Sequence, residues 1–165
     1  MSKLHKMDEE FPVREMKKKE FPSQLMEIPN PPEKLFIRGN LPGPNTKLLC
    51  VVGSRRYTNY GKEACEKLIS GLRGYDVAIV SGLAIGIDGI AHQAAIDTGL
   101  KTIGMPGSGL NVDKIHPVAH VGLAQRILES GGCLLSEFEP DFRATIYSFP
   151  QRNRIAAGLS CATAS

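Results

Sequence analysis

Short apolar runs alternate with longer amphipathic segments through most of this chain, and this alternation limits the fold more than any other feature. Runs at residues 47–53, 76–82, 101–107 and 132–138 each have the length of a buried strand and lead into a turn. Their spacing of about 25 to 30 residues leaves room for a crossover helix between successive runs. The pattern predicts an α/β fold with a doubly wound, mainly parallel sheet and three layers, α/β/α.

The segments between these runs predict helices. In residues 87–98, apolar side chains recur at i, i+3, i+4, i+7 and i+8, which makes one apolar face, and Gly99 provides a stop signal. Further helices are expected around residues 64–72 and 118–130, each followed by glycine. A strand, a loop and a helix are therefore repeated three times.

Residues 1–45 lack this regularity. Five prolines and two glycines fall between Pro29 and Pro44, which predicts an irregular lead-in, packed on or preceding the core, and neither a helix nor a central strand there. Residues 46–165 are expected to form the main domain. With 165 residues and 42% hydrophobic content, the chain can bury one compact core.

Charge and cysteine content narrow the function classes only slightly. The formal net charge of +3 is compatible with a polyanionic ligand without requiring one. The N-terminus has no apolar signal core and no run is long enough to cross a bilayer, so we expect a cytoplasmic protein without a membrane partner. Four separated cysteines without a CxxC pair predict neither a zinc site nor disulfides, but small core residues.

Ligands of doubly wound sheets bind where the strands end and loops lead into helices. The unusual stretches "GSRRYTNYG", "SGLAIGIDG", "PGSGLN" and "SEFEP" all fall at such ends. Glycine-rich turns that enter helices can cradle phosphate with backbone N–H groups, although a glycine can also merely permit a tight turn. No stretch matches GxGxxG or GxxxxGK[ST], so the dinucleotide and P-loop fingerprints are both missing.

Basic and aromatic residues near these turns suggest a nucleic-acid ligand. Arg55 can place its planar guanidinium at the mouth of the first loop, whereas Arg56 is expected to face solvent. On an extended segment Arg152 and Arg154 could both face one side, whereas on a helix they would point in different directions and only one is expected to touch a ligand. Phe149 can stack on a base or fill the core.

Candidate catalytic groups are few. Asp88 and His92 have acid/base spacing on a helix, but an aspartate near a helix start paired with a histidine one turn later is the simpler interpretation. Glu137 follows a strand without an evident partner. His116 and His120 have no third ligand at metal spacing. We therefore predict no enzyme activity, no metal and no cofactor.

The chain closely resembles the DNA-processing protein family DprA, also called Smf, in six blocks from about Phe21 to Thr163: "LFIRGNL", "VVGSRRYTNYG", "VSGLAIGIDGIAH", "GSGLNVDKIHP", "LLSEFEP" and "FPQRNRIAAGLS". The resemblance implies an extended Rossmann-like domain that binds single-stranded DNA without established catalysis. It also implies a homodimer that protects incoming DNA and assists the loading of a RecA-type recombinase in recombination and natural transformation.

The residues that the resemblance implies lie on the rim that the loop argument selects. The expected DNA- and phosphate-binding residues are Gly53, Ser54, Arg55, Ser81, Gly82, Gly86, Ser108, Gly109, Phe149, Arg152, Asn153 and Arg154.

One departure from the family pattern lies at the C-terminus. The chain stops at "CATAS" where the family continues into another apolar strand, so we expect the last strand or strands to be missing and a dimer surface built there to be lost. An inert remnant is one alternative. Another is a nucleotide phosphoribohydrolase of the lysine-decarboxylase-like family, but "PGSGLNVDK" stands where such enzymes have PGGxGTxxE.

Overall fold

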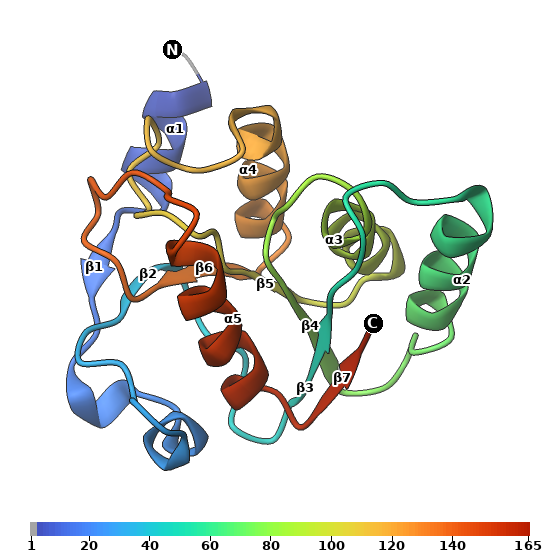
Figure 1. Cartoon of the computed structure of the whole chain (residues 1–165), viewed down its shortest axis with the longest axis horizontal. Helices are drawn as coiled ribbons and strands as arrows, with labels where there is room; N and C mark the ends of the chain where they lie inside the picture. The colour runs from blue at the N-terminus through green and yellow to red at the C-terminus, as the bar shows by residue number, and fades with distance from the viewer. Residues whose placement is uncertain (1–2) are drawn as a thin grey trace.

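A computed structural model describes residues 3–165 and the side chains of residues 5–165. Its strands are β1 (Arg14–Glu15), β2 (Phe36–Gly39), β3 (Lys47–Val51), β4 (Val77–Ser81), β5 (Thr102–Gly104), β6 (Cys133–Ser136) and β7 (Ala162–Ala164). They form one sheet in the order β1-β2-β6-β5-β4-β3-β7 (Figure 1). The five strands from β6 to β7 are parallel, whereas β1 and β2 are antiparallel to their neighbours.

Five α-helices accompany the sheet: α1 (Lys3–Glu10), α2 (Asn59–Ser70), α3 (Ile87–Thr98), α4 (Val121–Glu129) and α5 (Ser148–Leu159). Short 3₁₀ turns lie at Lys18–Glu20, Ser23–Glu27 and Val118–His120. The four predicted strands and three predicted helices are present. Helix α2, predicted around residues 64–72, begins earlier than expected because Thr58 caps it. The Thr58 hydroxyl accepts the N–H of Gly61 at 3.0 Å.

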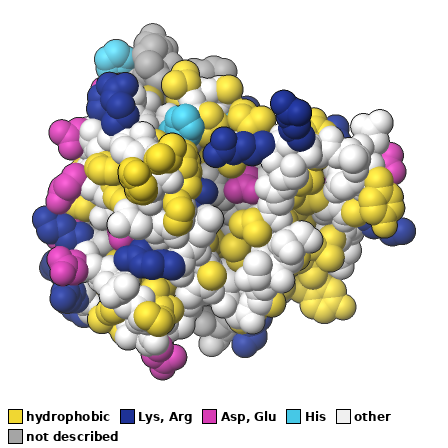
Figure 2. Space-filling model, viewed as in Figure 1, with side chains coloured by type: hydrophobic (Ala, Val, Ile, Leu, Met, Phe, Trp, Pro, Cys, Tyr) yellow, Lys and Arg dark blue, Asp and Glu magenta, His cyan; other side chains and the backbone are white. Residues whose placement is uncertain are grey.

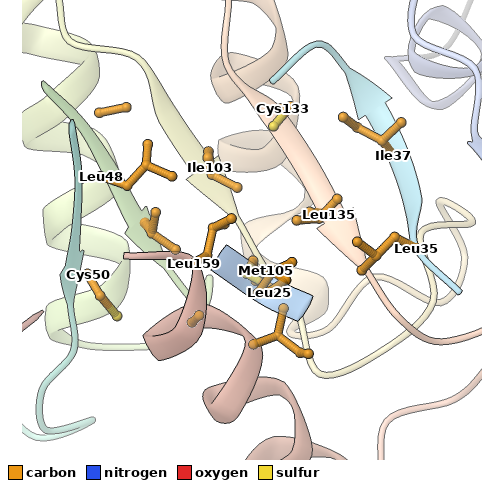
Figure 3. Close-up of a cluster of buried hydrophobic side chains, with 14 of the residues drawn as sticks. Leu25, Leu35, Ile37, Leu48, Cys50, Ile103, Met105, Cys133, Leu135 and Leu159 are labelled. Atoms are coloured by element: carbon orange, nitrogen blue, oxygen red, sulfur yellow. The ribbon is translucent and has the colours of Figure 1, made fainter. Parts of the chain in front are cut away.

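The central strands are buried on both faces, which confirms the three-layer fold. On β4, Ala78 and Val80 belong to a core shared with α5, whereas Ile79 packs with α2 and α3 on the other face. Figure 3 shows the α5 side of the sheet, with Leu159 of α5 against the side chains of the strands. The three middle side chains of β4 thus point alternately into two cores.

The prediction that residues 29–44 contain no central strand is wrong. β2 lies inside the sheet, antiparallel to β6, and Leu35, Phe36 and Ile37 are buried. The apolar run is only three residues long, and the prolines fall on either side of it, so they do not interrupt the ladder. Residues 3–10 also form a helix, which the absence of a long periodic pattern had concealed.

Arg38 on β2 ties this N-terminal part to the sheet. Its guanidinium is 1% exposed and donates to the carbonyl oxygens of Met7, Phe11 and Leu110 and to the Asp8 carboxylate. Met7 and Asp8 lie in α1, Phe11 lies just after it, and Leu110 lies in the loop after β5. These hydrogen bonds and the Asp8 carboxylate compensate the cost of burying the Arg38 charge.

Three of the four cysteines lie in the core, as the sequence predicts. Cys50, Cys65 and Cys133 are buried as expected, but Cys161 is exposed because it lies just before the outer strand β7. No helix within residues 3–165 has both the length and the apolar character that crossing a membrane requires.

Candidate functional site

Four loops and one helix start meet at the carboxyl edge of the parallel strands (Figure 1). Residues 52–58 follow β3, residues 82–86 follow β4, residues 105–117 follow β5, and residues 137–147 lead from β6 into α5. Of the twelve residues predicted to bind DNA, nine lie on or next to these segments, and Arg152, Asn153 and Arg154 lie further along α5. The structure nevertheless separates them into an exposed group and a buried group.

A buried carboxylate occupies the centre of this edge. Asp88, in the first turn of α3, is 5% exposed and accepts N–H bonds from Gly53 at 3.4 Å and from Gly82 at 3.1 Å. Burial raises the pKa of Asp88, and its bond from Gly82 and the nearby positive charge of Arg152 oppose that shift. The Asp88 carboxylate therefore already binds the N–H groups of Gly53 and Gly82, which the sequence had suggested as phosphate ligands.

Arg152 stands on the other side of Gly82. It is 7% exposed, and its Nη1 donates to the carbonyl oxygens of Gly82, at 2.9 Å, and of Met105, while Nε donates to Asn153 Oδ1 at 2.8 Å. Burial lowers the pKa of Arg152, and Asp88 counteracts this. A Cβ at Gly82 would overlap this guanidinium, which explains the glycine. Arg152 thus supports the loops from below the surface.

The exposed group centres on the Phe149 ring, which is half-buried. The guanidinium of Arg55 lies 5.6 Å from the ring centroid, that of Arg152 lies 5.8 Å away, and the ring of His116 packs at 5.7 Å. Gly107 forms the floor, since a Cβ there would lie 2.7 Å from Phe149 Cδ1. Arginine beside an aromatic face is a stable arrangement that leaves the guanidinium edge free.

A small hollow of about 70 Å³ opens at this ring, lined by Arg55, Gly82, Ala84, Ile85, His116, Pro117 and Phe149. Arg55 is exposed, and among residues 5–165 no acidic group or carbonyl takes a hydrogen bond from its guanidinium. Figure 2 shows Lys, Arg and His side chains, with some acidic ones, among hydrophobic side chains in the upper part of the view, where these loops lie. A free cation beside a flat apolar ring is suited to a phosphate with an adjoining base.

The shape of the loop after β3 depends on Gly86, a residue of the neighbouring loop that has φ +97° and directly precedes α3. A Cβ at Gly86 would overlap the carbonyl oxygen of Ser54. That oxygen accepts the N–H of Ile87 at 3.2 Å, so the loop of residues 53–56 rests on the start of α3. This contact presents Ser54 and Arg55 at the surface.

Ser81, Ser108 and Gly109, expected near phosphate, are buried and bonded within the protein. Ser81 donates to Val51 O at 2.6 Å, Ser108 donates to Gly109 O at 3.0 Å, and the Gly109 N–H donates to Phe142 O at 2.9 Å. These residues fix the course of the loops beneath the exposed group.

Arg154 lies apart from Phe149, in an ion pair with Glu137. Its guanidinium donates to both carboxylate oxygens, at 2.5 and 3.0 Å. The structure thus gives Glu137, the candidate catalytic carboxylate, a bidentate partner. Asn153 is exposed and accepts from Arg152, so its amide nitrogen remains available at the surface.

His92 does not pair with Asp88. It is fully buried, its Nε2 accepts the N–H of Leu83 at 3.3 Å, and its Nδ1 lies 2.7 Å from the Thr102 hydroxyl. Since that hydroxyl donates to Ile79 O, Nδ1 carries the proton. Burial lowers the pKa of His92 to about 3. The histidine is therefore neutral and structural.

Sequence reasoning missed Leu83, which has φ +62° although it is not a glycine. His92 binds its N–H, and its carbonyl oxygen accepts from Nδ1 of His120 at 2.5 Å. These two contacts hold a conformation that leucine rarely adopts. No local signal marks it, because both partners come from distant positions. Within the described part of the chain, no group of three His, Cys, Asp or Glu is placed to hold a metal.

Comparison with known proteins places this arrangement in a family. A family model described as DNA recombination-mediator protein A matches residues 13–164. Protein Smf of Escherichia coli is 44% identical over 140 residues, which make up 85% of this chain and 37% of that protein. DNA processing protein DprA of Streptococcus pneumoniae is 40% identical over 94% of this chain and 54% of its own length. The chain thus spans about a third to a half of these relatives.

Two solved structures are similar throughout this chain. The X-ray structure of DprA from Streptococcus pneumoniae superposes with a TM-score of 0.80 and 38% identity, covering 96% of this chain and 55% of that one. DNA processing protein A from Helicobacter pylori, described for its single-stranded DNA binding mode, superposes with a TM-score of 0.79 and 30% identity over 93% and 68% of the two chains. The chain belongs to the DNA recombination-mediator protein A family, the DprA or Smf proteins.

Proposed function

We propose that this chain binds single-stranded DNA at the carboxyl edge of its sheet, with Arg55 on a backbone phosphate and Phe149 against a base or sugar. One observation carries the proposal: the Arg55 guanidinium is exposed, lies 5.6 Å from the Phe149 ring centroid and has no acidic partner among the described residues. Backbone neutralisation with sequence-tolerant stacking is the usual way in which proteins hold single strands.

Ten of the twelve predicted residues then divide by task, whereas Gly53 and Gly86 shape the loop that carries Ser54 and Arg55. Ser54, Arg55, Phe149 and Asn153 are the proposed direct contacts, because each has exposed or half-exposed atoms at this edge. Arg152 with Gly82, and Ser81, Ser108 and Gly109, act from beneath by holding the loops. Arg154 takes part only if a phosphate displaces Glu137 from its ion pair.

The wider role follows from the family. We propose that this binding protects incoming DNA in the cytoplasm and assists a RecA-type recombinase during recombination and natural transformation. The family description, the names of the relatives and the single-stranded DNA binding for which the Helicobacter pylori structure is described support this role. Binding itself needs no second copy of the chain, because Arg55 and Phe149 come from the same one.

A nucleotide phosphoribohydrolase remains the rival function, and the site gives it little support. Such an enzyme needs a carboxylate free to act on the ribose bond, whereas Asp88 is bonded to Gly53 and Gly82 and Glu137 is paired with Arg154. Two of the relatives compared above carry the name DNA processing protein. Incubation with nucleoside monophosphates tests the rival directly: release of free base would establish it.

Titration of a labelled oligothymidylate at two salt concentrations tests the proposed function. Arg55→Ala is compared with wild type and with Arg73→Ala, an exposed arginine in the turn between α2 and β4. We expect only Arg55→Ala to weaken binding and to reduce the slope of log K against log salt by about 0.7, which is one phosphate contact on a single strand. Equal affinities and slopes for all three proteins would refute the proposal.

A further inference from the structure

A groove leads away from the Arg55 and Phe149 hollow along helix α3. Its volume is about 580 Å³, and α2, α3 and the 3₁₀ turn with α4 provide its walls. Ile85, which is 45% exposed, lines both the hollow and the groove, so the two are continuous. Pockets of about 300 to 1,000 Å³ accommodate ligands of nucleotide size.

The end of the groove nearest the hollow has the chemistry of a nucleotide site. Tyr57 is 46% exposed and follows Arg55 by two residues, so their Cα atoms are at most about 7 Å apart. Lys62 is exposed and forms no ion pair among the described residues, and His120 faces the groove across Gly89, where a side chain would collide with its ring. A flat ring, a free ammonium and a floor without side chains are thus brought together.

The far end of the groove is acidic. Asp97 accepts a hydrogen bond from Gln93 at 2.9 Å, Gln93 in turn accepts from Arg126, and Glu66 lies one turn beyond Lys62 on α2. Arg126 keeps its positive charge while its guanidinium donates to the neutral Gln93 amide, so two carboxylates and one cation leave this end with a net charge of −1. A polyanionic strand is attracted to the near end and repelled from the far end.

We propose that the near end of this groove, at Tyr57 and Lys62, holds the nucleotide next to the one at Arg55 on the same single strand. Tyr57 stacks on its base and Lys62 neutralises its phosphate. The inference rests on the proposed function, since Arg55 supplies the first phosphate contact. The acidic far end then makes the strand leave the surface after this nucleotide.

Oligothymidylates of increasing length separate the two sites, because the shortest occupies only the Arg55 hollow and longer ones also reach the groove. The variants are Tyr57→Ala and Lys62→Glu. Lys67→Glu is the matched control, with the same charge change on the same helix but outside the groove. We expect Tyr57→Ala and Lys62→Glu to leave the shortest oligonucleotide unaffected and to weaken longer ones by about fivefold to a hundredfold.

Two results would overturn the inference. One is that Lys62→Glu and Lys67→Glu lower the affinity equally at every length. The other is that wild-type affinity does not rise beyond the shortest oligonucleotide that needs Arg55. A failure of the proposed function looks different, because Arg55→Ala then binds the shortest oligonucleotide as wild type does, and the groove inference falls with it.

Discussion

Asp88 and Arg152 hold the same residue by its two backbone groups: Asp88 Oδ2 accepts the Gly82 N–H at 3.1 Å, and Arg152 Nη1 donates to the Gly82 carbonyl at 2.9 Å. Asp88 comes from α3 and Arg152 from α5, helices that cover opposite faces of the sheet. The loop after β4 is therefore fastened between both helical layers. An internal carboxylate and guanidinium do this at the place where a nucleotide-binding fold would present free N–H groups.

Asp88→Asn is expected to destabilise the protein by about 2 to 4 kcal/mol. The amide has one acceptor oxygen for the two N–H groups of Gly53 and Gly82, and it leaves Arg152 buried without a counter-charge. Urea unfolding measures the difference. Asp97→Asn, an exposed change on the same helix, serves as the control and should shift the midpoint only slightly. Equal midpoints for the two variants would contradict the fastening role of Asp88.

Arginine to lysine substitutions at positions 55 and 152 are expected to separate binding from stability. Arg152→Lys loses the planar fork that reaches Gly82 and Met105 together, so the free energy of unfolding should fall by about 1 to 3 kcal/mol. Arg55→Lys retains a surface cation and should unfold like wild type, with a modest loss of oligonucleotide affinity. The hypothesis that Arg152 binds phosphate directly would instead predict a binding loss without a stability loss.

The strand and helix layers could be predicted because each central element carries a local pattern. Residues 87–98 show their apolar face in their spacing and end at Gly99, which adopts φ +82° as a helix stop should. β2 could not be predicted in this way, because three apolar residues between prolines carry no period of their own. Its place is decided by β6, which is nearly a hundred residues away and offers an unpaired edge.

The position of the site could be predicted from the sequence. Which of its residues are exposed for contact with DNA and which are buried beneath the loops could not. Strand ends identified the right loops, and Arg55 and Phe149 lie together there. Whether an arginine faces solvent or a carbonyl depends on contacts between distant segments, as Arg152 with Gly82 and Arg154 with Glu137 illustrate. The residue type tells which ligands an arginine can bind. Only the folded structure tells whether its guanidinium is already bonded to a carbonyl or carboxylate of the protein.

Gly107→Ala is expected to weaken DNA binding through Phe149. The new methyl group would lie 2.7 Å from the ring, so the ring must leave its present position beside Arg55. If base stacking contributes about 1 to 3 kcal/mol, oligonucleotide affinity should fall by about fivefold or more. Gly43→Ala is the control, because a methyl group there meets no neighbouring atom. Unchanged affinity in Gly107→Ala would show that the ring position does not matter for binding.

Cys161 is expected to be the only cysteine that an alkylating reagent modifies in the native protein. It is exposed, whereas burial raises the pKa of Cys50 to about 11 and that of Cys133 to about 12, and it also raises that of Cys65. The thiolate is the reactive form, so buried thiols with raised pKa values react slowly. Mass spectrometry after brief treatment at mildly alkaline pH should find one modification, and denaturant should expose all four cysteines. Early modification of Cys133 would mean that the sheet opens readily.

His92 should make the protein less stable in acid. Its pKa in the folded chain is about 3, below its usual 6.5, so the unfolded state binds a proton first as the pH falls. The stability that neutral His92 contributes is complete above pH 6.5 and is lost toward pH 3, at about 1.4 kcal/mol per pH unit.

His92→Gln can still accept from Leu83 and donate to Thr102 but does not titrate. Between about pH 7 and about pH 5, urea unfolding should show wild type losing about 2 kcal/mol more than this variant. Parallel curves for wild type and His92→Gln would show instead that the buried imidazole takes up its proton without unfolding.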